Sequence, residues 1–316
     1  SAAAADGNNP ALMLGAALGE LTLAKRDKVT FLCSPSLAAF PSWAEQLIAE
    51  STGKDRKGIV PVANESPSAP EKYGADRCFV YLRLAGEQNH DLDRLVAALE
   101  ANGHPALRID LNDKDDLGQE FFRWEVAVAE AGAVIGIHPF NQPDVQLAKD
   151  LAKQAMSERG GKTARKPKEE VESTDPQALR QAVDSWLGKK KARDYVAVQA
   201  YINPSQENTA ELRGICAALQ GRLDAATTLG FGPRFLHATG QLHKGGPNSA
   251  LVLQIVDQPS DHLAVPETNY TFDALILAQA LGDLAALKQR RRRVLRVNLG
   301  NDTPGGLRNL LDALEK

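Results

Sequence analysis

The sequence has few of the features that define several common protein classes. Its 3 cysteines, Cys33, Cys78 and Cys216, lie far apart and inside apolar runs. Such spacing fits reduced thiols in a core better than a disulfide framework, and it contains no cysteine-based zinc motif. No apolar run reaches the roughly 20 residues that span a bilayer, and the start of the chain lacks the basic flank and apolar core of a signal peptide. We therefore expect a cytoplasmic protein with no membrane partner.

The chain also has no excess of positive charge. Its net charge is −3, so no global field would attract nucleic acid. The basic run Arg290–Arg293 lacks interleaved aromatic residues and is typical of a solvated helix end. Hydrophobic residues make up 43% and charged residues 24% of the 316 residues, a balance typical of folded globular proteins of this length with two domains. We expect no binding to nucleic acid.

Short apolar runs alternate with longer segments of helical periodicity, which is typical of a parallel sheet covered by helices. We therefore predict an α/β fold with a Rossmann-like parallel sheet. The predicted strands are Lys28–Cys33, Gly58–Val62, Cys78–Leu84, Ala106–Leu111, Val134–Ile137, Tyr195–Tyr201, Ala250–Val256 and Val294–Leu299. The predicted helices are Pro41–Ser51, Asp91–Asn102, Leu117–Ala131, Asp144–Ser157, Gln206–Leu219 and Tyr270–Arg290, and Gly103 and Gly132 are expected to end two of them.

A polar segment without periodicity, from about residue 156 to 176, predicts a linker. The chain is accordingly divided into an α/β domain at 1–157, a polar linker and helix at 158–190, and a smaller α/β unit at 191–316 that carries the loop with His243. The order of strands and helices suggests that the two halves are degenerate copies, with Cys78–Leu84 equivalent to Tyr195–Tyr201.

Gln46 and Glu50 are the first candidate site residues. They lie four residues apart in a predicted helix, so their side chains project from one face. Glu50 lies at the C-terminal end, where the helix dipole and the apolar neighbours both favour the protonated form of its carboxyl group. Such a group can move a proton near neutral pH. On spacing alone a surface helix with a polar face is the favoured interpretation, and a catalytic pair is the alternative.

Two polar loops supply further candidates. Gln142 and Lys149 follow a predicted strand end, where ligands bind in parallel α/β sheets, although the proline between them could also simply begin a solvated helix. The segment 231–248 is a non-periodic loop with two histidines, and such loops often carry binding groups. His243 is the stronger candidate because glycines and a lysine lie beside it, and His237 is the alternative. No cysteine or carboxylate cluster completes a metal site with them, so we expect no metal.

Three motifs resemble those of glucose-6-phosphate isomerase. They are Asn9-Pro-Ala-Leu-Met-Leu-Gly15, the segment Phe40–Lys54 that ends in Glu-Ser-Thr-Gly-Lys, and Pro139-Phe-Asn-Gln-Pro-Asp-Val with Lys149 beyond it. The isomerase part of the bifunctional transaldolase/glucose-6-phosphate isomerase also carries the loop His237-x-Thr-Gly-Gln-x-His-Lys-Gly-Gly246. The resemblance covers nearly the whole chain.

The resemblance implies sugar-isomerase (SIS) domains that interconvert glucose 6-phosphate and fructose 6-phosphate without a metal or organic cofactor. Glu50 matches the family's base, which moves a proton between C1 and C2 through an enediolate. Lys149 and His243 match the pair assigned to opening of the sugar ring.

The resemblance also implies binding residues and a partner. Gln46 and Gln142 match residues that position the sugar chain and the base, and we expect Lys54, the last residue of the second motif, to bind substrate as well. In the family the histidine comes from the neighbouring subunit, so the resemblance implies a homodimer. The glutamine–lysine motif precedes the histidine here, whereas in stand-alone members the histidine comes first.

One part of the family's site has no candidate in this sequence. We find no Ser/Thr-rich phosphate loop at a helix N-terminus, which a phosphate dianion requires, and no active-site arginine upstream of Asn9. We therefore expect a first SIS domain, with or without a transaldolase domain, to lie outside this chain, and the chain alone to be weakly active or inactive. Two alternatives stay open. One is an isomerase of another sugar phosphate, and the other is an SIS-type regulatory module that binds a sugar phosphate without turnover.

Overall fold

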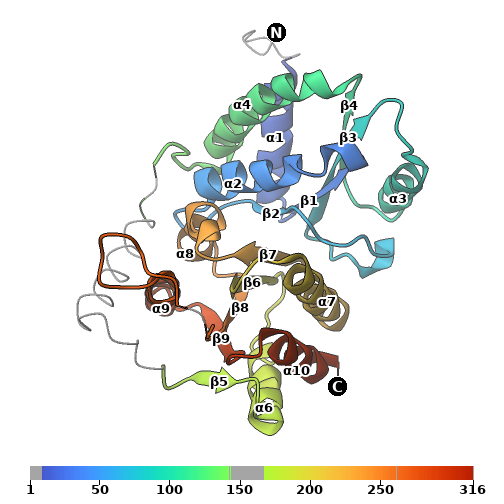
Figure 1. Cartoon of the computed structure of the whole chain (residues 1–316). Coiled ribbons are helices and arrows are strands. Elements are labelled where there is room, and N and C mark those ends of the chain that lie inside the picture. Colours follow the sequence, from blue (N-terminus) through green and yellow to red (C-terminus); the bar gives the residue numbers. More distant parts are fainter. Residues whose placement is uncertain (1–8, 142, 144–166, 261, 316) are drawn as a thin grey trace. The chain divides into compact units, whose positions relative to one another are not determined.

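The computed structural model describes residues 9–141, 143, 167–260 and 262–315 (Figure 1). The chain forms two compact units, Ser1–Pro143 with Ala238–Pro247, and Asp144–His237 with Asn248–Lys316. Each unit is built on one sheet, and all strand pairs are parallel. The predicted α/β class with parallel sheets is confirmed. None of the helices in the described ranges combines the length and apolar character that a membrane crossing needs.

The first unit has a four-stranded sheet in the order β2-β1-β3-β4. Its strands are β1 (Lys28–Cys33), β2 (Val60–Val62), β3 (Arg77–Leu84) and β4 (Ala106–Leu111). Its helices are α1 (Pro10–Leu23), α2 (Phe40–Thr52), α3 (His90–Ala101), α4 (Leu117–Ile135) and α8 (Thr239–Gly245).

Both faces of this sheet are covered by apolar packing. On one face Phe31 and Val80 belong to a cluster with Trp124 of α4, and the Phe31 and Trp124 ring centroids lie 5.4 Å apart. On the other face Phe79 and Tyr81 pack with residues of α3. Buried parallel strands require this pattern, because helices cover them on both sides.

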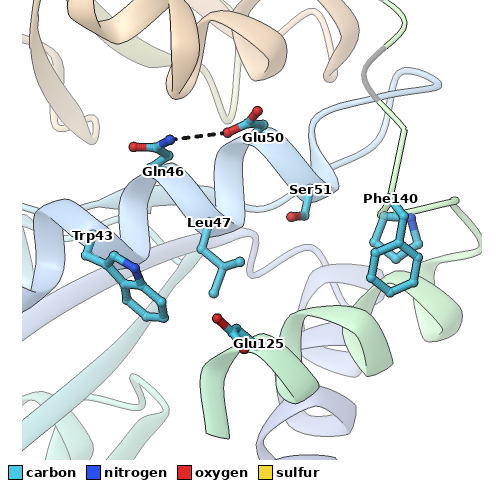
Figure 2. Close-up of a pocket in the computed structure, with 8 residues that line it drawn as sticks. Trp43, Gln46, Leu47, Glu50, Ser51, Glu125 and Phe140 are labelled. Carbon is cyan, nitrogen blue, oxygen red and sulfur yellow. Dashed lines mark hydrogen bonds between the residues drawn. The ribbon is translucent and has the colours of Figure 1, made fainter. Parts of the chain in front are cut away.

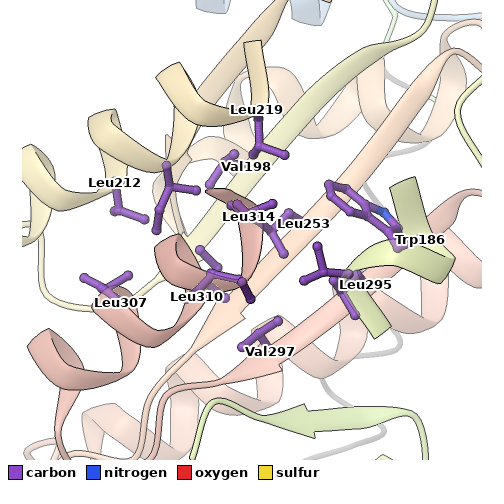
Figure 3. Packing of buried hydrophobic residues seen from close by; sticks show 14 of the residues in the cluster. Trp186, Val198, Leu212, Leu219, Leu253, Leu295, Val297, Leu307, Leu310 and Leu314 are labelled. Carbon is purple, nitrogen blue, oxygen red and sulfur yellow. The ribbon is translucent and has the colours of Figure 1, made fainter. Parts of the chain in front are cut away.

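The second unit has a five-stranded sheet in the order β5-β9-β8-β6-β7. Its strands are β5 (Glu170–Glu172), β6 (Tyr195–Tyr201), β7 (Thr227–Phe231), β8 (Ala250–Val256) and β9 (Arg293–Asn298). Its helices are α6 (Pro176–Leu187), α7 (Gln206–Leu223), α9 (Phe272–Gln289) and α10 (Thr303–Glu315). Residues of α6, α7 and α10 form the main apolar core with one face of the sheet, as Figure 3 shows for Trp186, Leu219 and Leu310.

The two units repeat one arrangement. In chain order the strands β6, β7, β8 and β9 take the order second-first-third-fourth across the sheet, and β1, β2, β3 and β4 do the same. This makes Lys28–Cys33, and not Cys78–Leu84, the equivalent of Tyr195–Tyr201. The predicted alignment of the two halves was therefore shifted by two strands and is wrong. The alternation of strands and helices cannot show which strands are equivalent, because every βα pair looks alike along the chain. The order of the strands across the sheet shows it.

The predicted strand Val134–Ile137 is wrong, because α4 continues to Ile135. Gly132 lies inside this helix, and Ile135 continues the buried face on which Trp124 lies. The helix ends at Gly136, whose φ of 70° suits a glycine. An apolar run of four residues fits a helix end as well as a strand, and here the helical periodicity decides.

The boundaries of the units also differ from those we expected. The segment 158–190 contains β5 and α6, both of which are part of the second unit. The loop with His243, which we expected in the smaller C-terminal unit, is a helix that packs with the first unit. The predicted helix Asp144–Ser157 lies outside the described residues.

Candidate active site

The helix α2 carries the first candidate residues. Phe40, Ala44 and Ile48 are buried and recur at a spacing of four, which fixes one face of the helix against the core. Gln46 and Glu50 therefore project from another face, as their spacing predicted. The side-chain amide of Gln46 donates to Oε2 of Glu50 at 3.5 Å, a long hydrogen bond (Figure 2). Glu50 is half-buried and Gln46 is exposed.

An open hollow of about 420 Å³ lies beside these two residues. The described residues that line it are Trp43, Gln46, Leu47, Glu50, Ser51, Glu125, Pro139 and Phe140. Figure 2 shows Gln46 and Glu50 on one side of α2 and Glu125, from α4, on the other. Apolar walls with a few polar groups are typical of a small-molecule site. No lysine, arginine or histidine is among these lining residues.

Aromatic packing fixes one wall of the hollow. The ring of Trp43 lies 4.6 Å from that of Phe121 and 5.4 Å from that of Phe40, measured between centroids. Glu125 lies one helical turn beyond Phe121 on α4. The sequence analysis missed Glu125, because a lone glutamate in an amphipathic helix gives no signal until the neighbouring helix is known.

Two lysines donate to backbone carbonyls at the end of α4 and in the loop that follows it. The ammonium group of Lys54 is buried and donates to the carbonyl oxygens of Pro139, at 3.3 Å, and Asn141. Lys57 donates to the carbonyl of Ile135 at 2.9 Å, where α4 ends and a positive charge is favoured. The structure therefore gives Lys54 backbone partners, and a contact between Lys54 and substrate stays a prediction.

Two of the predicted residues, Gln142 and Lys149, lie outside the described residues. The described loop reaches Asn141, whose carbonyl is held by Lys54, which follows α2.

The structure separates the two candidate histidines. His243 lies in α8, is buried, and belongs to the same compact unit as Glu50. His237 is exposed, ends the 3-10 turn Arg234–His237, and belongs to the second unit. This arrangement brings His243, and not His237, into the unit of the hollow. Within the described ranges no group of three or more histidine, cysteine, aspartate or glutamate residues could hold a metal ion.

The fold and the site define an α/β protein of two parallel-sheet units, with a carboxylate-bearing helix beside an open hollow. Its sequence is similar to glucose-6-phosphate isomerases. The enzyme of Leptospira biflexa is 26% identical over 207 residues, with 54% of this chain and 45% of that protein covered. The enzyme of Lactobacillus helveticus is 30% identical over 148 residues, with 35% of this chain and 33% of that protein covered. The chain thus spans less than half the length of either relative.

Two other comparisons add little. No family model matches the sequence. The solved C-terminal domain of glucosamine-fructose-6-phosphate aminotransferase from Francisella tularensis covers 97% of this chain and 92% of its own, with a TM-score of 0.27 and 10% identity. A likeness of this size carries no argument about the fold, which rests on the strand order described above.

Proposed function

We propose that this chain is part of a sugar-phosphate isomerase and that the reaction is the interconversion of glucose 6-phosphate and fructose 6-phosphate. The observation that carries the proposal is the half-buried carboxylate of Glu50, paired with Gln46 at the rim of the hollow. The similarity to glucose-6-phosphate isomerases of two organisms supports the same reaction.

The proposed chemistry needs only one base. The carboxylate of Glu50 removes the proton from C2 of the open-chain aldose, and the electron pair of that C–H bond forms the C1–C2 double bond of an enediolate. Return of the proton to C1, with a proton moved from the hydroxyl on C2 to the oxygen on C1, gives the ketose. Atoms and electrons balance without any external oxidant or reductant. Gln46 would hold the carboxylate in place through its amide.

Ring opening would precede this step. We propose that His243 moves the proton between the ring oxygen and the anomeric hydroxyl, with Lys149 as its counterpart. Gln142 would bind the sugar chain. His243 lies in a helix that packs against α2, which supports a shared site with Glu50.

The phosphate group would be bound outside the hollow. Glu50 and Glu125 give the hollow two carboxylates, and none of its described lining residues is basic. A phosphate dianion would be repelled there, whereas the neutral hydroxyls of the sugar fit between a carboxylate and an aromatic wall. The hollow therefore suits the reacting end of the substrate.

Isotope exchange tests the proposal with high sensitivity. We expect the chain, supplied with its first SIS domain and incubated with fructose 6-phosphate in D2O, to replace a hydrogen on C1 by deuterium, detected by proton NMR. Glu50→Gln should lower the exchange rate by about 10²–10⁴-fold, because the amide cannot accept the proton. Calorimetry should show that this variant still binds the sugar phosphate.

Glu125→Gln is the matched control, since it removes the same charge from the other side of the hollow. We expect its exchange rate to stay within about threefold of the wild type. Binding of fructose 6-phosphate by the wild type without exchange would contradict the proposal and favour a regulatory module. Equal exchange in the wild type and in Glu50→Gln would exclude Glu50 as the base.

We propose a homodimer on the basis of the family resemblance alone. Sedimentation equilibrium of the protein should then give twice the mass of one chain. A single-chain mass at micromolar concentration would contradict it.

A further inference from the structure

A tight turn just after α2 begins and ends with a lysine. The backbone N–H of Lys57 donates to the carbonyl of Lys54 at 2.9 Å, and the two residues form an isolated antiparallel bridge. Between them Asp55 and Arg56 have φ values of 55° and 60°. Two successive residues with positive φ are typical of a type I′ turn, which asparagine and glycine adopt more easily than aspartate and arginine. Backbone strain of this kind points to a turn with a function.

Both lysine side chains reach the segment that follows α4. The ammonium group of Lys57 donates to the carbonyl of Ile135, the last residue of α4, at 2.9 Å. The ammonium group of Lys54 is buried and donates to the carbonyl of Pro139 at 3.3 Å and to that of Asn141. Burial of a charged group costs free energy unless hydrogen bonds replace those it made with water. The carbonyls of this segment supply such bonds to Lys54.

Residues 136–141, which we call the α4 loop, also pack on α4 itself. Pro139 lies against Gly132 of the helix, where a Cβ atom would be 3.2 Å from Cγ of the proline. Pro139 and Phe140 line the hollow, as does Ser51 near the end of α2 (Figure 2). The α4 loop therefore forms one wall of the hollow, and it is held by α4 on one side and by the turn after α2 on the other.

The helix α8 holds the same turn through other contacts. The N–H of Arg56 donates to the carbonyl of Gly245 at 2.9 Å, and the side-chain amide of Gln241 donates to the carbonyl of Gly53 at 2.9 Å. Gly53 allows this close approach, because a Cβ atom there would lie 2.3 Å from Cα of Leu242. The two lysines thus extend from a turn whose own position is fixed.

We propose that Lys54 is a positioning residue, which holds the α4 loop on the turn and so fixes the wall of Pro139 and Phe140 relative to Glu50. A base acts efficiently only when the reacting carbon is held in the right place, so movement of this wall should slow the reaction. This role differs from the contact with substrate that we expected for Lys54. The effect on catalysis rests on the function proposed above, whereas the attachment of the loop does not.

Limited digestion with chymotrypsin tests the attachment without any reference to activity. The side chain of Phe140 is 80% exposed, but a protease cuts the bond after it only when the α4 loop leaves its place. Lys54→Met should raise the initial rate of this cut by about tenfold, because the carbonyls of Pro139 and Asn141 lose a charged donor. Mass spectrometry of the fragment that ends at Phe140 measures the rate.

Lys28→Met is the matched control. Lys28 is also a buried lysine of the first unit, but its ammonium group pairs with Asp27 at 2.8 Å and with Asp76 at 3.1 Å. These ion pairs stay intact when the α4 loop alone opens, so the variant should lower the urea midpoint and leave the cut after Phe140 unchanged. An unchanged rate in Lys54→Met would exclude Lys54 as the group that holds the loop. Equal increases in both variants would reduce it to a residue that only stabilises the unit.

The kinetics of isotope exchange separate positioning from a contact with substrate. In the chain supplied with its first SIS domain, Lys54→Met should lower kcat by about 10–100-fold and change KM by less than about threefold. Lys28→Met should leave both constants unchanged. A higher KM with an unchanged kcat in Lys54→Met would mean a direct contact with substrate and would refute the positioning role.

A double-mutant cycle tests whether Lys54 acts through the wall. Pro139→Ala/Phe140→Ala removes the side chains that the α4 loop presents to the hollow. In that background Lys54→Met should lower kcat by less than about threefold, because the wall that it positions is already gone. The same loss of kcat with and without the wall would mean that Lys54 acts by another route.

The two proposals fail in different ways. Faster cutting after Phe140 in Lys54→Met, without isotope exchange in the wild type, would refute the proposed function and leave the attachment of the loop intact. Exchange that depends on Glu50, with a cut that Lys54→Met does not change, would refute the attachment and leave the function intact.

Discussion

The two sheets share one strand order but differ in the side chains on one face. The face covered by α3 in the first unit is apolar, and the face covered by α9 in the second unit is polar. In the first unit α3 packs on Phe79 and Tyr81, and the ring of Phe79 lies 4.9 Å from that of Tyr73. In the second unit the equivalent helix, α9, covers a row of polar side chains. The same strand order therefore accommodates an apolar interior in one unit and a polar one in the other, so the strand order alone does not determine the kind of side chain beneath the helix.

The polar row crosses the sheet in register. Gln199 of β6 pairs with Gln254 of β8, which pairs with Arg296 of β9, which pairs with Glu170 of β5. Nε of Arg296 lies 2.5 Å from Oε2 of Glu170, and both side chains are almost fully buried. Arg296 also donates to the side-chain carbonyl of Gln254, whose amide donates to the carbonyl of Ala280 in α9 at 3.2 Å. The row thus links β5, the central strands and α9.

Tyr201 extends this polar face at the end of β6. Burial and the nearby carboxylate of Asp283 raise its pKa well above the ordinary value, so the phenol stays neutral. An apolar face depends mainly on volume and shape, whereas a buried polar face depends on every partner being present. The second unit should therefore be the more sensitive of the two to loss of a single group.

The largest effect is expected from Arg296→Met. The substitution leaves the carboxylate of Glu170 buried without its cation, which should lower the unfolding free energy of the second unit by about 3–5 kcal/mol. Urea titration followed by fluorine NMR of 5-fluorotryptophan separates Trp186, in the second unit, from Trp43 and Trp124, in the first. Arg94→Met is the control, because the pair of Arg94 with Asp91 is exposed, and it should change nothing.

Removing both charges should reverse most of that loss. Arg296→Met/Glu170→Leu removes both charges from the row and leaves its two glutamines, and we expect at least half of the lost free energy to return. The same titration measures it. If the double variant were no more stable than Arg296→Met, the buried charge of Glu170 would not be the cause of the loss.

A smaller effect is expected at a helix contact of the first unit. The α1 helix lies so close to α4 that a Cβ atom on Gly15 would be 2.4 Å from the carbonyl oxygen of Ala127 and 2.6 Å from Cβ of Glu130. Gly15→Ala should therefore destabilise the first unit by about 1–3 kcal/mol. The Trp124 resonance reports it, and a stability equal to or above that of the wild type would contradict such close packing.

A substitution of the same kind at a helix glycine of the second unit is expected to raise stability. Gly214 lies inside α7, and a Cβ atom there would meet only a methyl group of Leu311, at 4.0 Å. Gly214→Ala should stabilise this unit by about 0.5–1 kcal/mol, because alanine loses less backbone entropy in a helix. The transition of Trp186 should move to higher urea. A shift to lower urea would mean that α7 is packed as closely as α1.

The smallest effect is a dependence on pH in the first unit. Burial lowers the pKa of His104, whose ring packs edge-on against those of Tyr73 and Phe79. The unfolded chain therefore takes up a proton near pH 6.5 that the folded chain still refuses, so stability falls as pH drops from 7 towards the folded pKa. His104→Phe should reduce this fall, measured as urea midpoints of Trp124 at pH 7 and 5. The exposed His138, changed to Gln, should leave it unaltered.

Most strands could be predicted from the sequence because they are short segments rich in apolar residues. Lys28–Cys33, Ala106–Leu111, Tyr195–Tyr201 and Ala250–Val256 have the predicted bounds. The helix α1 was missed although its start is visible: Asn9 precedes Pro10, and the Asn9 side chain accepts the N–H of Ala11 at 2.9 Å. An Asn-Pro pair of this kind is a usable helix-start signal. The polar row was not predictable, because its register joins strands far apart in the sequence.

In the candidate site, too, local features could be predicted from the sequence and long-range contacts could not. The spacing of Gln46 and Glu50 is local, and the prediction that they share a helix face is confirmed. The partners of Lys54 and of Gly53 come from distant segments, and nothing near them in the sequence specifies a loop carbonyl or Leu242. Local propensity places a residue on a helix or in a turn, and long-range contacts then determine which groups it binds.

The packing of α8 in the first unit has a consequence for the order in which the chain can fold during synthesis. As the chain leaves the ribosome, the whole sheet of the first unit emerges before α8 does, and β7 of the second unit must emerge in between. Until then the turn at Gly53 has no cover and its carbonyl no donor. A nascent chain can thus complete one sheet while the surface around Glu50 is still open, and that surface is covered only after β7 of the second unit has emerged, before β8 and β9.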